Sequence, residues 1–85
     1  QYWLGETYYV RGDFKAAADA FLKSYNLHKA GDKAPDSLVR LSMALGELGQ
    51  KDAACATLGQ FKTAFPSADA VLRDQARSEA ARLGC

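Results

Sequence analysis

A pattern of small and large residues that occurs twice, 37 residues apart, limits the folds open to this chain of 85 residues. The two copies are Gly12, Ala17 and Phe21, and then Gly49, Ala54 and Leu58. The glycine permits a positive backbone angle in a tight turn, and the alanine lets a neighbouring helix come close. The residues before each glycine also match, with Leu4 and Tyr8 at the offsets of Leu41 and Leu45. Each unit therefore reads as a helix, a glycine turn and a second helix.

Self-similarity at a period of roughly 20 to 50 residues is the sign of a solenoid, and the tetratricopeptide pattern is W-x2-L-G-x2-Y followed by Ala, Phe and Pro. The first unit supplies Leu4, Gly5, Tyr8, Ala17 and Phe21 of that pattern. The second supplies Leu41, Leu45, Ala54, Leu58 and Pro66, with Ser42 in place of the small glycine. The sequence thus predicts an all-α tetratricopeptide repeat (TPR) solenoid with two helix-turn-helix repeats and a C-terminal capping helix.

The expected helices cover residues 2–11, 13–27, 34–48, 52–64 and 69–83, and no segment alternates with the period of a strand. Asp13 is the expected N-cap of the second helix, Pro66 ends the fourth, and Gly84 is the expected C-cap of the fifth. We expect a single domain over 1–85, with repeat one at 1–29, repeat two at 35–66 and the capping helix at 69–83. Because the chain opens on Gln1 with no initiator Met, we expect a C-terminal fragment of a longer protein.

Charge and composition narrow the class of partner. Eleven basic and ten acidic residues give a net charge of +1 and are spread along the chain without blocks, while 48% of the residues are hydrophobic. No basic stripe exists to neutralise a phosphate backbone, which argues against nucleic acid. The apolar runs are far shorter than a membrane span, which argues against direct membrane insertion.

The sequence contains no constellation that predicts an enzyme. His28 is the only histidine, and it stands in a polar loop with no cysteine or carboxylate at metal-ligand spacing. The patterns H-E-x-x-H, G-x-S-x-G, C-x-x-C and the P-loop are all missing. We therefore expect a non-enzymatic protein without catalytic residues, cofactor or metal.

Repeat geometry predicts the surface that binds a protein partner, because the first helix of each unit lines the concave face of such an array. The residues expected to point into that face are Tyr2, Glu6, Tyr9, Val10, Asp36, Val39, Arg40, Met43 and Glu47. A competing interpretation is that Tyr2 and Tyr9 only cover a neighbouring repeat. The Lys/Asn clamp for a free peptide carboxylate is not present at these positions, so a mixed apolar and charged face favours a helix or an extended segment of a partner.

Several stretches resemble one named family beyond the generic repeat pattern. They are Tyr2-Trp3-Leu4-Gly5-Glu6-Thr7-Tyr8 followed by Gly12-Asp13-Phe14, then Lys33-Ala34-Pro35-Asp36, Gln50-Lys51-Asp52-Ala53-Ala54-Cys55 and Arg82-Leu83-Gly84-Cys85. Together they resemble the C-terminal domain of the Tol-Pal system cell division coordinator, over nearly the whole chain. The shared motifs are packing motifs, so they transfer no partner-contacting residues.

The resemblance implies a periplasmic protein of Gram-negative bacteria whose upstream coiled coil trimerises. It also implies protein partners, namely the periplasm-spanning TolA protein and a peptidoglycan synthase, and a role in coupling wall synthesis to outer-membrane constriction. The alternative is a generic TPR scaffold in secretion or outer-membrane lipoprotein assembly. A signal peptide and heptads upstream would favour the coordinator.

Cys55 and Cys85 are the only cysteines, and the compartment that the resemblance implies is oxidising. Helices four and five should be antiparallel across the Pro66 turn, although their helical lengths alone leave the two sulfur atoms several ångströms short of meeting. A turn from Pro66 to about Asp69 would absorb part of that distance, and a bend in the Gly84-Cys85 tail would close the rest. The sequence thus favours a Cys55–Cys85 disulfide, with two unpaired thiols as the alternative.

Overall fold

The structure is a computed structural model that describes residues 1–85 and consists of five α-helices and their connecting turns. The helices are α1 (Tyr2–Val10), α2 (Phe14–Leu27), α3 (Ala34–Glu47), α4 (Lys51–Ala64) and α5 (Ala70–Leu83). The helix pattern predicted from the sequence is confirmed, and no helix end differs from its predicted position by more than one residue. Two aspartates cap helices as N-terminal acceptors: Asp13 accepts from the Ala16 N–H at 3.3 Å, and Asp69 accepts from the Leu72 N–H at 3.0 Å.

The odd-numbered helices α1, α3 and α5 all end in the same way. Each is followed by a glycine with a left-handed backbone, with φ of +80° at Gly12, +79° at Gly49 and +77° at Gly84. In each case the amide after the glycine donates to a carbonyl five residues back. These bonds of 2.9 Å run from Asp13 to Tyr8, from Gln50 to Leu45 and from Cys85 to Ala80. The predicted capping helix α5 therefore ends like the first helix of a repeat.

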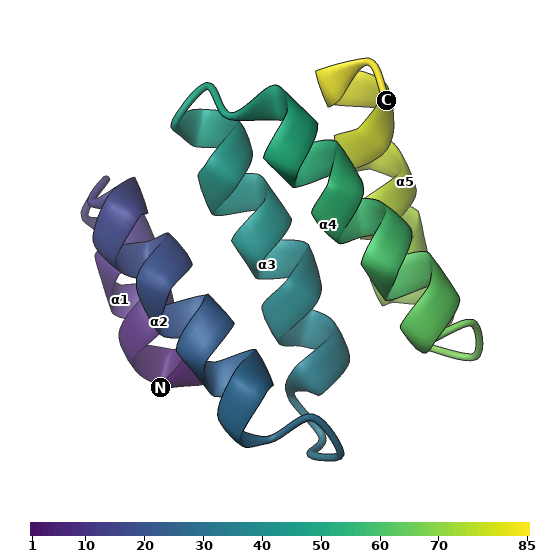
Figure 1. Cartoon of the computed structure of the whole chain (residues 1–85), viewed down its shortest axis with the longest axis horizontal. Coiled ribbons are helices and arrows are strands. Elements are labelled where there is room, and N and C mark those ends of the chain that lie inside the picture. Colours follow the sequence, from purple (N-terminus) through teal and green to yellow (C-terminus); the bar gives the residue numbers. More distant parts are fainter.

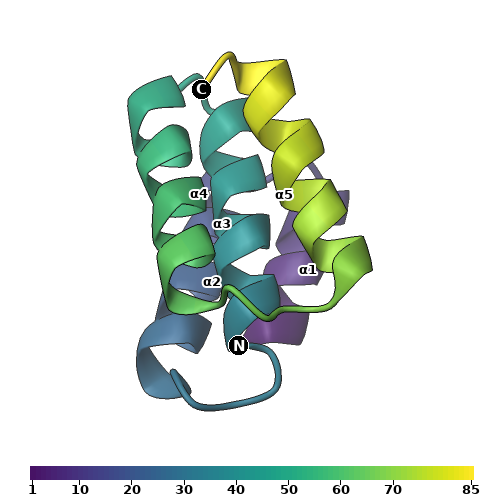
Figure 2. The same cartoon turned by 90° about the vertical axis from the view of Figure 1, so that its right-hand side faces the viewer.

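Helix α3 occupies the centre of the molecule and packs against α2, α4 and α5. Figure 1 shows α2, α3 and α4 side by side, with α1 behind α2 and α5 behind α4. After a quarter turn, Figure 2 shows α2 and α4 on one side of α3 and α1 and α5 on the other. The two sides form an outer layer of second helices and an inner layer of first helices, as expected for stacked helix pairs.

The hydrophobic core consists of two clusters that share α3. One cluster joins α1, α2 and α3, and its buried members are Tyr2, Ala17, Ala18, Phe21, Leu41 and Ala44. The other cluster contains residues of all four helices α2, α3, α4 and α5. Its buried members are Tyr25, Ala34, Leu38, Val39, Leu58, Phe61, Leu72 and Ala76. The repeated alanines Ala17 and Ala54 are both fully buried, which is the close helix contact that the repeat predicts.

A disulfide between Cys55 and Cys85 joins the chain end after α5 to the first half of α4, with Cα atoms 5.6 Å apart. The left-handed turn at Gly84 directs Cys85 back toward α4. This is the bend that the helix lengths required. None of the five helices is long and apolar enough to cross a membrane.

Candidate functional site: the inner face of the helix array

The inner face is the surface formed by α1, α3 and α5. Seven of the nine residues predicted to bind a partner are at least partly exposed. Val10 is 86% exposed and Glu47 is also exposed. Five others are partly buried: Glu6, Tyr9, Asp36, Arg40 and Met43.

Two of the predicted residues are not available to a partner. Val39 is fully buried in the cluster that contains Leu72 and Ala76, because α5 packs on α3 as well as on α4. Tyr2 is 7% exposed, and its ring packs edge-on against Phe21 with centroids 5.6 Å apart. The assignment of Tyr2 and Val39 to an open concave face is therefore corrected, since both belong to the core.

Arg40 links α3 to α1 at the centre of the inner face. Its Nε lies 3.4 Å from a Glu6 carboxylate oxygen, and its Nη1 donates to the Met43 sulfur at 3.9 Å. Partial burial lowers the pKa of Arg40, but a hydrogen bond with Tyr2 and the charge of Glu6 outweigh it, so the pKa is raised overall. Arg40 and Glu6 are thus already paired, and they act mainly as a bridge between two helices.

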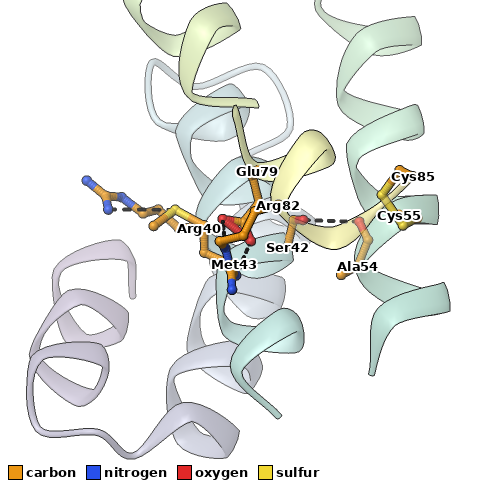
Figure 3. A network of polar contacts seen from close by, with 8 residues as sticks. All are labelled: Arg40, Ser42, Met43, Ala54, Cys55, Glu79, Arg82 and Cys85. Carbon is orange, nitrogen blue, oxygen red and sulfur yellow. Dashed lines mark hydrogen bonds and ion pairs between the residues drawn. A yellow bond between two sulfur atoms is a disulfide. The ribbon is translucent and has the colours of Figure 1, made fainter. Parts of the chain in front are cut away.

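The inner face has a second ion pair, between Glu79 and Arg82, both of which lie on α5. This pair was not anticipated from the sequence. Glu79 is only 8% exposed, and Arg82 donates to both of its carboxylate oxygens, with Nε to Oε1 at 3.2 Å (Figure 3). The pair lies close to α3 because Gly46 has no side chain; a Cβ there would be 3.1 Å from Arg82 Nη2.

A signal for Glu79 was present in the sequence. Leu72, Ala76, Glu79 and Leu83 share one stripe of α5 at helical spacing, so a carboxylate there faces inward and needs a partner. Arg82, three residues later, supplies that partner.

Tyr9 of α1 lies near charged groups of both α3 and α5. Burial raises its pKa, and the carboxylates of Glu47 and Glu79 raise it further, against the opposing effect of Arg82 and Arg40. The Tyr9 ring packs edge-on against Phe14, with centroids 5.1 Å apart, which holds the ring in place. The phenol hydroxyl at this position can donate a hydrogen bond to a partner.

The accessible part of the inner face combines aromatic, thioether and carboxylate groups. Tyr9 and Met43 offer partly exposed apolar surface, and Glu47 is an exposed carboxylate that forms no ion pair within the chain. No group of three or more His, Cys, Asp or Glu side chains is placed to hold a metal ion. The arrangement is suited to contacting another polypeptide through an apolar side chain and a basic group.

Comparison with known protein families agrees with this geometry. Residues 36–68, from α3 to the turn before α5, match the family model described as tetratricopeptide repeat. No curated protein matches the chain significantly. The five helices, the absence of strands and the family match define an all-α tetratricopeptide-type helical repeat fold. Repeats of this kind serve as protein–protein interaction modules.

Proposed function

We propose that this chain is the partner-binding domain of a periplasmic cell division coordinator associated with the Tol-Pal system. In this role it binds a TolA-type periplasm-spanning protein, and also a peptidoglycan synthase, so that wall synthesis keeps pace with outer-membrane constriction. The sequence stretches that resemble the coordinator family support the choice of this particular system. The repeat fold supports a non-enzymatic binding role, and the disulfide fits an oxidising compartment. The same proposal includes trimerisation of the full-length protein through an upstream coiled coil.

The observation that carries the binding role is the grouping of Tyr9, Met43 and Glu47 on the inner face. Tyr9 and Met43 are held by neighbouring side chains, so little conformational freedom is lost when a partner covers them. Glu47 has no ion-pair partner of its own and can receive a lysine or arginine. A partner segment with one apolar and one basic side chain therefore fits this surface.

The binding role is tested with Tyr9→Ala and Met43→Ala. Each substitution should weaken binding of the periplasmic domain of a TolA-type protein about 5- to 30-fold, because interface anchors of this kind contribute ~1–2 kcal/mol or more. Isothermal titration calorimetry measures the affinity, and circular dichroism checks that the helices remain.

Leu27→Ala is the matched control, since Leu27 is an exposed apolar residue at the end of α2, in the outer layer. It should leave binding unchanged. Normal binding by both Tyr9→Ala and Met43→Ala, or loss of helix in both, would show that the inner face is not the binding surface.

The cellular role is tested by deleting the gene that encodes the chain. We expect defects in constriction and raised detergent sensitivity, especially when wall synthesis is inhibited, because the coupling between the two processes is lost. Microscopy of dividing cells and plating on detergent measure both effects. Normal division and normal detergent resistance under that stress would favour instead a TPR scaffold that acts in secretion or lipoprotein assembly.

A further inference from the structure

A cavity of about 570 Å³ lies between α4 and α5, away from the inner face. Its floor is apolar and includes Leu58, Phe61 and Ala76, which are buried, and Phe65 and Ala80, which are partly buried. The Cys55–Cys85 disulfide also lines this cavity. We call this cavity the α4–α5 groove.

The α4–α5 groove is the repeat equivalent of a smaller cavity of about 390 Å³ between α2 and α3. Helices α2 and α4 correspond at an offset of 37 residues, and α3 and α5 at an offset of 35, which is the offset of Gly49 and Gly84. At these offsets, six residues that line the smaller cavity have equivalents in the groove. Ala18, Leu22 and Tyr25 correspond to Cys55, Gly59 and Lys62, and Leu38, Leu41 and Leu45 correspond to Arg73, Ala76 and Ala80.

The two cavities differ in the wall that the next helix provides. The smaller cavity is bordered by Thr57 and Gln60 of α4, the helix that follows α3 and packs on it. No helix of the described chain occupies the equivalent place on α5. The groove thus has the floor and one wall of a helix-binding position, and its second wall is open.

At three of the six equivalent positions, the groove has a much smaller residue than its counterpart. Gly59, Ala76 and Ala80 stand where the smaller cavity has three leucines, and a Cβ built on Gly59 would meet no atom within 4 Å. Small residues let the backbones of two helices approach closely, because the distance between helix axes is set by the side chains at the contact. These positions therefore allow a helix to approach α4 and α5 closely.

The charge around the groove has a single sign. Its lining includes Lys62, Arg73 and Arg77 and no acidic residue. Arg77 is paired with Asp74, and that pair is largely exposed, whereas Lys62 and Arg73 form no ion pair. The whole chain has a net charge of only +1, so this grouping is local. Two unpaired cations beside an apolar floor are complementary to acidic side chains that flank an apolar stripe.

We propose that the α4–α5 groove binds an amphipathic helix of a partner protein, with an apolar stripe against Leu58, Phe65 and Ala80 and acidic residues facing Lys62 and Arg73. The partner helix takes the position on α5 that α4 takes on α3, so the repeat array is continued by another polypeptide. This is the helix-in-groove mode of peptide recognition. The interaction uses a surface separate from the inner face, and its test is independent of the proposed Tol-Pal role.

The probe for this proposal is a labelled, designed helical peptide of about 18 residues, with leucine at i, i+4, i+7 and i+11 and glutamate on both flanks of that stripe. Fluorescence anisotropy with the oxidised chain should give a dissociation constant of about 1–100 µM, as expected for a small interface. A peptide with lysine in place of each glutamate should bind at least about tenfold more weakly. Equal binding of the two peptides, or no binding of either at about 100 µM, overturns the proposal.

Variants locate the binding on the chain. Gly59→Trp fills the groove from an open position and should abolish peptide binding, while Gly59→Ala should retain it. The double charge reversal Lys62→Glu with Arg73→Glu should weaken binding at least about tenfold, whereas Lys15→Glu with Lys23→Glu on the exposed surface of α2 should not.

Two further outcomes would contradict the assignment. In the first, the double variant Tyr9→Ala with Met43→Ala loses peptide binding while the Lys62→Glu/Arg73→Glu variant binds normally. That result would place the peptide on the inner face. A peptide-free dimer that Gly59→Trp dissociates, seen by sedimentation, would make a second copy of this chain the occupant. If Gly59→Trp loses helical circular dichroism, the charge-reversal pair and its α2 control decide the result.

Discussion

At the scale of single residues, the contact between the two helices of each unit depends on a matched pair of large and small side chains. Gly5 is buried on α1, and a Cβ there would lie 2.7 Å from ring atoms of Phe21. In the second unit Ser42 stands at the place of Gly5, and the smaller Leu58 stands at the place of Phe21. Ser42 is fully buried and donates to the Ala54 carbonyl at 3.0 Å, so its hydroxyl is satisfied. The unit with the phenylalanine ring therefore requires glycine at the facing position, and the unit with the smaller leucine accepts serine there.

The space around two helical glycines, Gly5 and Gly59, predicts opposite effects of the same substitution. Gly5→Ala should destabilise the fold by about 1–3 kcal/mol, because the added methyl group overpacks against Phe21. Gly59→Ala in α4 meets open space and should stabilise the fold by up to about 1 kcal/mol through helix propensity. Urea unfolding followed by circular dichroism measures both. An equal change of the same sign in the two variants would refute the packing account.

At the scale of elements, α5 depends on few neighbours. It packs on α3 and α4, and its outer surface is largely exposed. The last residues of the chain are held by two devices, the left-handed turn at Gly84 and the disulfide to Cys55. The disulfide closes a loop over a sequence separation of 30 residues, which restricts the unfolded chain.

Removing the disulfide should therefore lower the stability strongly and loosen α5 first. For Cys55→Ala with Cys85→Ala we expect a loss of about 3–4 kcal/mol and a fall in melting temperature of more than about 10 °C. Hydrogen exchange should accelerate in α5 before α3. Mass spectrometry with and without reductant establishes the bond in the isolated protein. Two freely alkylated thiols, with a melting temperature that reductant does not change, would contradict the prediction.

At the scale of the whole molecule, α3 joins the two hydrophobic clusters. Leu38 and Val39 belong to the cluster shared with α4 and α5, and Leu41 and Ala44 belong to the cluster shared with α1 and α2. Loss of α3 therefore exposes both clusters at once, and neither half of the array retains a core of its own.

We accordingly expect the chain to unfold in one cooperative transition. Differential scanning calorimetry should give equal calorimetric and van't Hoff enthalpies. Leu38→Ala should cost about 2–5 kcal/mol and shift the whole transition without splitting it. Two resolved transitions, or a van't Hoff enthalpy well below the calorimetric one, would mean that the two repeats unfold separately.

The helices and the close helix pairs can be predicted from the sequence alone. Each unit needs a turn with positive φ followed by a tight helix contact. The same spacing therefore recurs, with Gly12 and Ala17 in one unit and Gly49 and Ala54 in the other. Such features depend on neighbours within a few turns of the same chain segment. They can therefore be read from residue types and their period.

The surfaces that a partner can reach, in contrast, depend on how the helices pack in three dimensions. The position of α5 against α3 buries Val39, brings Glu79 and Arg82 to the inner face, and leaves the groove beside α4 open. The sequence predicted α5 as a helix but did not fix its packing angle, because its contact residues Ala76 and Ala80 are small and permit several close approaches. Exposure is a property of how α3, α4 and α5 are placed together, and the helical period of α5 indicates only which of its residues face inward.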